Sequence, residues 1–341
     1  MKTLFFYGTL RDRETLAAVL GPHLAEVKAE AAVLADHAVM AVAGEDFPTI
    51  VAEPGGRAEG LVVSGLSDAA IARLVFFEDE FDYELRAVEV ETTDGLRPAE
   101  VFFSHGAKIE PAGPWDFAAW AEAHRGAFVE SARELMAFYG TLPDEEVDRI
   151  WPGIRIRAYA RARAGAGARP ARFAGGLGPG DVEVAEVTRP YVDHFAVEHR
   201  RLRHRRFGGG MSSEMGRAVF ATGDAVTVLP WDPGRDRVLL IEQFRAGPHA
   251  RGDTQPWMIE PVAGRIDRAA GAEEVLRAEA LEEAGLTLGR LARVGAYYPS
   301  PAILTEEITS YVGEAKLDGA GGLYGLPTEH EDIRAFTLPF S

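Results

Sequence analysis

A loop followed by a helix is predicted by one stretch, Gly264-Arg-Ile-Asp-Arg-Ala-Ala-Gly-Ala-Glu-Glu-Val-Leu-Arg-Ala-Glu-Ala-Leu-Glu-Glu-Ala-Gly-Leu286. From Ala272 onward the residues are good helix formers, with two glutamates at the positive end of the helix dipole and Gly285 as a stop. Glu279, Glu282 and Glu283 are spaced i, i+3 and i+4, so all three project from one narrow face.

This acidic face is unusual for a helix that only meets solvent. Such a helix commonly places Lys or Arg four residues after a Glu, whereas Glu279 is followed by Glu283. Each like-charge pair of this kind costs about 0.2–0.5 kcal/mol. A hard divalent cation would turn the repulsion into attraction, because such cations bind carboxylate oxygens. The three residues alone leave an acidic, solvated helix open as the alternative.

The order of residues in the stretch resembles the Nudix box, a loop and helix that hold Mg²⁺ or Mn²⁺ against a diphosphate. The matching elements are Gly264, Glu279 and the run Leu281-Glu-Glu-Ala-Gly-Leu286. Two positions depart from the family pattern, because Ala270 replaces a Glu and Ala278 replaces an Arg. Arg277 cannot substitute for that Arg, since one residue turns it about 100° away from the acidic face.

Composition places the chain among ordinary globular proteins. Its 341 residues are 47% hydrophobic and 26% charged, which suggests two domains of ordinary size. The net charge of −17 argues against a general nucleic-acid binder. No cysteine is present, which excludes disulfides, zinc thiolates and thiol nucleophiles. We see no signal peptide and no membrane-spanning segment in the sequence, and we expect a cytoplasmic protein.

Two halves joined by a linker are predicted. We expect a first domain at residues 1–142, a helical segment and an Ala/Gly/Arg/Pro-rich linker at 143–181, and a second domain at 182–341. Apolar runs predict strands at 3–7, 33–42, 49–52, 59–63, 88–92, 100–103, 182–187, 191–206, 225–230, 238–243, 291–297 and 308–312. Helices are predicted around Leu16, at 68–78 and at 115–138.

The basic run His199-Arg-Arg-Leu-Arg-His-Arg-Arg206 invites a nucleic-acid interpretation. An exposed strand with a few core-facing apolar positions fits the acidic chain better. Attraction of a phosphate-bearing small molecule remains open.

A carboxylate is expected inside the first half. Ile71, Leu74 and Val75 mark one face of the helix at 68–78, and Glu78 is the next position on that face. Burial raises the pKa of a carboxylate, which suits a group that exchanges protons near neutral pH. A core glutamate bonded to backbone amides or to Arg86 is the alternative.

A second motif lies at the end of the first strand, Phe6-Tyr-Gly-Thr-Leu10. A sharp turn at Gly8 leaves backbone N–H groups free to bind an anion. Tyr-Gly-Thr-Leu, followed by an apolar helix ending in Phe-Glu and then Tyr83-Glu-Leu-Arg86, resembles the γ-glutamylcyclotransferase-like (AIG2-like) family over about residues 1–140. Asp79 departs from the Gly usual after that Glu.

This resemblance implies a mixed β-barrel with helices and a particular chemistry. The backbone of Tyr7, Gly8, Thr9 and Leu10 would hold the α-carboxylate of a γ-glutamyl amine or peptide. Glu78 would take a proton from the α-amine, which attacks its own γ-carbonyl, and would return a proton to the leaving amine. The products would be 5-oxoproline and an amine or peptide.

Residues 182–338 resemble the ADP-ribose pyrophosphatase branch of Nudix hydrolases. The matching segments include Met211-Ser-Ser-Glu214, 225–230, 238–245, 256–257, 259–260, 262–264, Pro301, Gly325-Leu326 and Glu329-His-Glu-Asp-Ile333. The resemblance implies an α/β/α sandwich and a homodimer. It also implies a substrate, a nucleoside diphosphate sugar such as ADP-ribose.

Site residues follow from the same resemblance, position by position. Metal ligands would be Glu279, Glu282, Glu283, Glu306 and the carbonyl of Ala263. Arg245 and Glu260 would contact the nucleotide, and Glu329, with Glu331 in reserve, would activate water. Glu307 stands where a basic residue is expected, and the chain stops at Ser341 without the C-terminal helix usual in this branch.

The preferred hypothesis is an Mg²⁺-dependent pyrophosphatase fused to a γ-glutamylcyclotransferase-like domain. Ala270 and Ala278 favour an alternative, a pseudoenzyme that binds metabolites without turnover. A third possibility is that only the first domain is catalytic. Similar two-domain chains carry tellurite-resistance names, which imply a stress phenotype.

Overall fold

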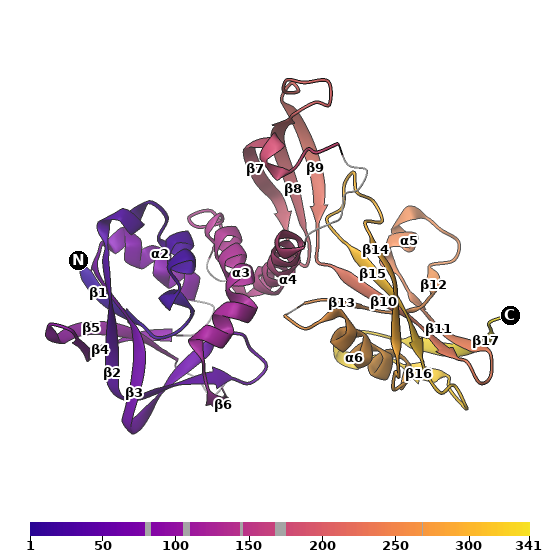
Figure 1. The fold of residues 1–341 in the computed structure, drawn as a ribbon, viewed down its shortest axis with the longest axis horizontal. Coiled ribbons are helices and arrows are strands. Elements are labelled where there is room, and N and C mark those ends of the chain that lie inside the picture. Colours follow the sequence, from indigo (N-terminus) through magenta and orange to yellow (C-terminus); the bar gives the residue numbers. More distant parts are fainter. Residues whose placement is uncertain (79–82, 105–109, 144–145, 168–174, 268) are drawn as a thin grey trace. The chain divides into compact units, whose positions relative to one another are not determined.

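Two compact units make up the chain in the computed structural model, Met1–Ala166 and Gly167–Ser341 (Figure 1). The structure describes residues 1–78, 83–104, 110–143, 146–167, 175–267 and 269–341. Part of the predicted linker, residues 168–174, lies outside these ranges, as do Asp79 and Arg268. The domain boundaries given above therefore stay predictions.

A closed ring of five strands forms the centre of the first unit. The strands neighbour one another in the order β3-β1-β5-β4-β2, and β2 pairs again with β3 to close the ring, while β6 adds to β2. Their bounds are β1 Lys2–Phe6, β2 Lys28–Val42, β3 Pro48–Leu66, β4 Tyr83–Thr92, β5 Gly95–Ser104 and β6 Pro111–Pro114. Phe5, Leu34, Val62 and Val101 are among the apolar side chains that fill this core. The predicted mixed barrel is confirmed.

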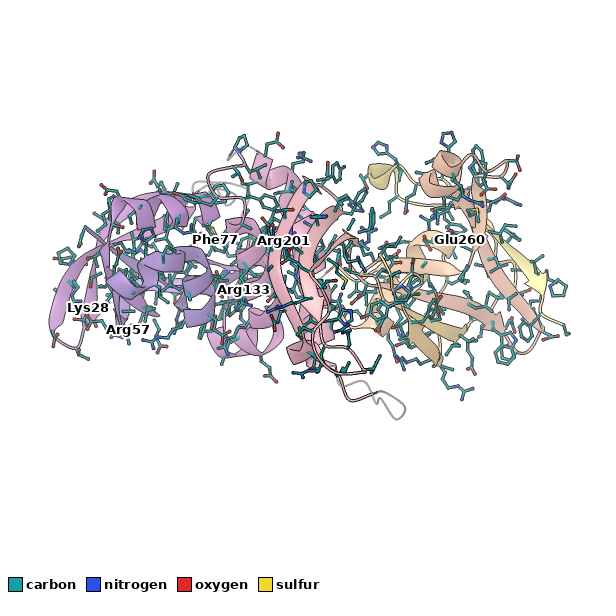
Figure 2. All side chains as sticks on the ribbon, turned by 90° about the horizontal axis from the view of Figure 1, so that it is seen from above. Lys28, Arg57, Phe77, Arg133, Arg201 and Glu260 are labelled. Atoms are coloured by element: carbon teal, nitrogen blue, oxygen red, sulfur yellow. The ribbon has the colours of Figure 1, made fainter. Side chains whose placement is uncertain are left out.

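Helices α1 (Arg13–Leu20), α2 (Asp68–Glu78) and α3 (Phe117–Met136) pack on one another beside the ring. The helix predicted at 68–78 is confirmed residue for residue. The prediction of its buried face is wrong at Val75, which is 39% exposed. Leu74 and Phe77 are buried instead (Phe77 is labelled in Figure 2). Apolar residues occur on nearly every side of this helix, so spacing alone could not show which side meets the core.

Helix α4 (Val147–Ala166) belongs to the first unit, because it packs along α3. A buried ion pair joins the two helices. The Arg157 Nη2 atom lies 2.7 Å from Glu134 Oε1, and both side chains are 1% exposed. Arg161 also contacts Glu134 and lies 3.3 Å from the half-buried Glu130.

Removing one partner of this pair should be costly. We expect Glu134→Ala to destabilise the first unit by about 3–5 kcal/mol, because Arg157 would keep a buried and uncompensated charge. Glu130→Ala removes a more exposed pair on the same helix and should cost under about 1 kcal/mol. Urea denaturation followed by circular dichroism measures both. Equal effects of the two substitutions would contradict a decisive role for burial.

The second unit is built on an eight-stranded mixed sheet. The order is β14-β15-β10-β11-β17-β16, with β12 beside β11 and β13 beside β10. Strands β10 and β15 are parallel, and the other pairs are antiparallel. The bounds are β10 Ala225–Asp232, β11 Arg237–Phe244, β12 Trp257–Glu260, β13 Val262–Arg265, β14 Leu291–Tyr297, β15 Ile308–Glu314, β16 Gly322–Tyr324 and β17 Ile333–Pro339.

Helix α6 (Ala272–Ala284) packs on this sheet, where it contacts β13, β10, β16 and β17. Its apolar side, with Leu276 and Ala280 fully buried, joins Val226, Leu239 and Ile333 in the core. The short helix α5 (Ala246–Arg251) follows β11. A mixed α/β unit is thus present, and the finer α/β/α layering stays a prediction.

A separate three-stranded sheet contains β7 (Val182–Val192), β8 (Ala196–His204) and β9 (Met215–Ala221). The basic run lies mostly on β8, where acidic neighbours neutralise it. Arg203 Nη2 is 2.5 Å from Glu183, and Arg201, labelled in Figure 2, lies 3.1 Å from Glu214. Arg205 is 2.6 Å from Asp181. Ion pairing on an exposed strand therefore accounts for this run.

No helix within the described residues is long and apolar enough to cross a membrane.

Candidate active sites

The first unit has a pocket, partly open to solvent, at the end of β1. Among the described residues that line it, Glu78 supplies the one carboxylate, and most of the others are aromatic. The lining residues are Phe5, Phe6, Tyr7, Gly8, Thr9, Leu10, Phe47, Pro48, Glu78 and Phe102. All five residues predicted for this site, Glu78 and 7–10, are therefore brought together.

The turn after β1 shapes one wall of this pocket. Gly8 precedes a 3-10 turn, Thr9–Arg11, whose first N–H groups have no acceptor within the turn. A Cβ atom on Gly8 would lie 2.9 Å from Pro48 Cγ, so the two walls touch at this residue. A larger residue at position 8 would have to displace Pro48.

Glu78 ends α2 and faces this apolar surrounding. Burial raises the pKa of its carboxyl to about 8, as expected from the sequence. The alternative partner Arg86 is engaged elsewhere, because it pairs with Glu84 and stacks over Phe103 at 5.2 Å. A carboxyl group with this pKa can both accept and return a proton near neutral pH.

The second unit places a buried carboxylate, that of Glu283, against β13. Its Oε2 accepts a hydrogen bond from the Ala263 N–H at 3.1 Å, and its Oε1 one from Gln243 Nε2 at 3.5 Å. Glu283 is 3% exposed. Desolvation, together with the negative charge of Glu331, raises its pKa to about 7, although the Ala263 bond acts in the other direction.

Glu279 lies one turn earlier on α6 and reaches the next residue of β13. A Cβ atom built on Gly264 would fall 2.2 Å from Glu279 Oε1, so the carboxylate occupies the space that the glycine leaves. Glu279 and Glu283 thus meet consecutive residues of the same strand. Arg277 turns away as expected and donates to the carbonyls of Leu288 and Gly289, beyond the helix end.

The two residues predicted to contact the nucleotide form an ion pair. Arg245 Nη2 is 2.8 Å from Glu260 Oε2 (Glu260 is labelled in Figure 2). The positive charge of Arg245 also favours the ionised form of Glu283. Glu306 lies near Arg265 and Asp224, and desolvation raises its pKa.

The other predicted metal and catalytic residues differ in their burial and contacts. Glu282 is exposed on α6. Glu331 accepts from the Leu326 N–H at 3.3 Å and adds to the negative potential at Glu283. The side chain of Glu329 lies outside the described residues. Across the described ranges, no three His, Asp or Glu side chains are already gathered into a metal-binding group.

The donor chemistry nevertheless fits a hard divalent cation. Two carboxylates one helical turn apart reach neighbouring residues of β13, and one of them is buried with a raised pKa. Glu331 adds like charge to that carboxylate. A cation of the Mg²⁺ type would relieve this repulsion and bind these oxygens.

Sequence comparison matches each unit to a known group. Residues 4–117 match the family model "Gamma-glutamyl cyclotransferase, AIG2-like". The chain is 41% identical over 162 residues to the ADP-ribose pyrophosphatase of Escherichia coli K12, covering 48% of this chain and 77% of that protein. The chain belongs to the ADP-ribose pyrophosphatase family, with an AIG2-like domain in front.

Two other relatives show the breadth of this Nudix family. The ADP-ribose pyrophosphatase of Haemophilus influenzae is 32% identical, covering 46% of this chain and 74% of its own length. The GDP-mannose pyrophosphatase of Pectobacterium atrosepticum is 31% identical, covering 44% of this chain and 76% of its own length. Each of these relatives is named for a pyrophosphatase activity.

Sequence reasoning missed several residues around both sites of this Nudix and AIG2-like chain. Gln243 is buried against Glu283, and Arg265 lies near Glu306. Neither is part of the acidic pattern, although Gln243 falls within a matching segment and Arg265 within the box. Phe47, from the loop before β3, Pro48 on β3 and Phe102 on β5 join the AIG2-like pocket although they are distant in sequence, which only the closed ring could show.

Proposed function

We propose that the second unit hydrolyses the diphosphate of ADP-ribose, or of a related nucleoside diphosphate sugar, with Mg²⁺ or Mn²⁺. Hydrolysis of ADP-ribose would give AMP and a phosphosugar. The observation that carries this proposal is Glu283, a buried carboxylate with a raised pKa held against β13. A solvated acidic helix would not bury this residue.

We assign each residue the role that the family resemblance implies. Glu279, Glu282, Glu283, Glu306 and the Ala263 carbonyl would hold the metal, which when bound neutralises the diphosphate and acidifies water. Gln243 and the Ala263 N–H orient the Glu283 carboxylate. Glu329 or Glu331 would take the proton of the attacking water.

Cationic groups beside the acids would bind the substrate. Arg245, fixed by Glu260, would contact the nucleotide. Arg265 lies near Arg245 and Glu306, where its charge can bind a phosphate oxygen. Both arginines can offer two N–H groups to one phosphate.

The test is AMP release from ADP-ribose by the full chain, with GDP-mannose as a second substrate. We expect release with Mg²⁺ or Mn²⁺ and none after chelation with EDTA. If ADP-ribose instead raises the melting temperature and stays intact with every divalent ion, the pseudoenzyme alternative is correct. A homodimer stays a prediction, which light scattering of the same sample tests.

The first-unit pocket favours a second function, γ-glutamyl cyclotransfer. The backbone of Tyr7–Leu10 would hold the α-carboxylate, and Glu78 would remove a proton from the α-amine. The amine nitrogen then bonds to the γ-carbonyl carbon, the original amide C–N bond breaks, and Glu78 returns the proton to the leaving amine. 5-Oxoproline and a free amine result.

The walls of the pocket indicate which leaving amine fits. Among the described lining residues Glu78 is the one carboxylate and none is cationic, and Phe5, Phe6, Phe47, Pro48 and Phe102 supply apolar surface. An uncharged amine with an apolar group fits this lining better than a charged peptide. We expect 5-oxoproline from γ-glutamyl anilide at a higher kcat/KM than from γ-glutamylglycine, and the reverse order would reject this preference.

A further inference from the structure

The end of the loop between β2 and β3 contributes to one wall of the AIG2-like pocket. Phe47, its last residue, and Pro48, the first residue of β3, both line the pocket. Pro48 also touches the Gly8 wall, because a Cβ at Gly8 would lie 2.9 Å from Pro48 Cγ. A shift of this loop would therefore change the space where the α-carboxylate is proposed to bind.

Asp46, the residue before this wall, is held by side chains of α3 and α4. Its backbone carbonyl accepts from Trp120 Nε1 at 2.8 Å. Its carboxylate, 7% exposed, accepts from the Tyr159 hydroxyl and lies 3.0 Å from Arg155 Nη2. Arg155 Nη1 is also 3.0 Å from Glu45 Oε2, so two consecutive loop residues are tied to α4.

The Tyr159 hydroxyl is shared by two partners, since His124 Nδ1 lies 2.7 Å from it. Burial and the nearby Asp46 charge raise the pKa of Tyr159, so the hydroxyl stays protonated and donates to Asp46. Burial lowers the pKa of His124, which favours the neutral imidazole.

Two polar atoms of this network, Asp46 Oδ1 and Arg155 Nε, are buried and lack a hydrogen-bond partner in the described protein. A partly satisfied buried ion pair is weak evidence for a stabilising role, because desolvation offsets the attraction of the charges. A role in fixing the loop explains why the polar groups lie here.

Arg155 and Tyr159 lie outside residues 4–117, the part that matches the family model. We propose that Tyr159 and Arg155 are positioning residues, which hold Asp46 and thereby fix the Phe47–Pro48 wall of the substrate pocket. The inference rests on the proposed cyclotransferase function of that pocket. If these residues act in this way, α4 helps to hold one wall of the pocket in place.

The test compares Tyr159→Phe with Tyr139→Phe in the full chain. Tyr139 lies in the same unit, and its ring contacts Phe76 and Arg73, but no hydrogen bond of its hydroxyl is recorded within the described residues. We expect Tyr159→Phe to raise KM for γ-glutamyl anilide by about tenfold and to change kcat less than about twofold, as for one lost hydrogen bond. Tyr139→Phe should leave both unchanged.

Hydrogen–deuterium exchange of the segment 43–48, without substrate, is the independent measurement. We expect faster exchange in Tyr159→Phe than in the wild type and in Tyr139→Phe. Unchanged exchange, or an unchanged KM in an active enzyme, would overturn the positioning role. If the wild type forms no 5-oxoproline, the proposed function fails and exchange alone decides the inference.

Arg155→Met provides the second variant if Tyr159→Phe melts at a much lower temperature than the wild type. It keeps an apolar stem and removes both the Asp46 and the Glu45 contacts. The same rise in KM and in exchange is expected, and their absence would overturn the proposal.

Discussion

Glu279→Gln should lower the rate of ADP-ribose hydrolysis by about 10²–10⁴-fold, because a bound metal contributes several kcal/mol of transition-state stabilisation. Glutamine has the same size and keeps one carbonyl oxygen, but it lacks the negative charge that strengthens the binding of a hard cation. Folding should not suffer, since the substitution removes like-charge repulsion along α6, worth about 0.2–0.5 kcal/mol per pair. AMP release at saturating Mg²⁺ and the melting temperature are the two measurements.

Glu273→Gln is the matched control, since Glu273 is exposed in the first turn of the same helix. We expect it to keep nearly full activity. A Glu279→Gln enzyme as fast as the wild type would remove the metal role from this residue.

Gly264→Ala probes the same carboxylate without changing any charge. The added Cβ would lie within 2.2–2.5 Å of the Oε1, Cγ and Cδ atoms of Glu279, so that side chain must move. We expect a large loss of hydrolysis with only a small change in melting temperature. Full activity in this variant would show that the Glu279 position is not critical.

Glu78→Gln should abolish 5-oxoproline formation, with a loss of about 10²–10⁴-fold, the usual contribution of a general acid or base. Because the pKa of Glu78 is about 8, the basic carboxylate form increases as pH rises. The wild-type kcat/KM should therefore rise between pH 6 and pH 9 with an apparent pKa of about 8. Glu14→Gln, at an exposed residue of α1, should leave the profile unchanged.

The same pKa predicts a stability effect of defined sign. Between the ordinary value of 4.5 and the folded value of about 8, the folded chain keeps the Glu78 proton that the unfolded chain has lost. Stability contributed by this group therefore falls as pH rises through this window. Glu78→Gln should melt close to the wild type at pH 4.5 and above it at pH 9, as measured by calorimetry. Equal melting temperatures at pH 9 would contradict the burial of this carboxyl.

The sequence predicted the bounds of those helices and strands that end at nearby turn or polar residues. Asp68–Glu78 and Leu291–Tyr297 have the predicted bounds, since both end in clear turn or polar signals. Residues 49–52 and 59–63 were predicted as two strands, but they belong to one long β3. Gly55 and Gly56 suggested a break, although pairing with β2 continues across a register shift at Ala35 and His37.

In the candidate sites, too, the sequence predicted the local spacing of residues but not the contacts between distant segments. The spacing of Glu279 and Glu283 predicted one acidic face, but it could not show that only Glu283 is deeply buried. That difference depends on Ala263 and Gln243, which β13 and β11 bring to the helix. The sequence did not predict any role for the loop residue Asp46, because its partners are more than 70 residues away.

The buried ion pair of Glu134 and Arg157 determines where a fragment of the first unit should end. A fragment ending at residue 117, where the family match stops, would keep only the first residue of α3 and lose both members of that pair. It would also uncover the faces that α1 and α2 turn toward α3. Such a fragment should aggregate on expression, whereas one that ends near residue 166 should remain folded.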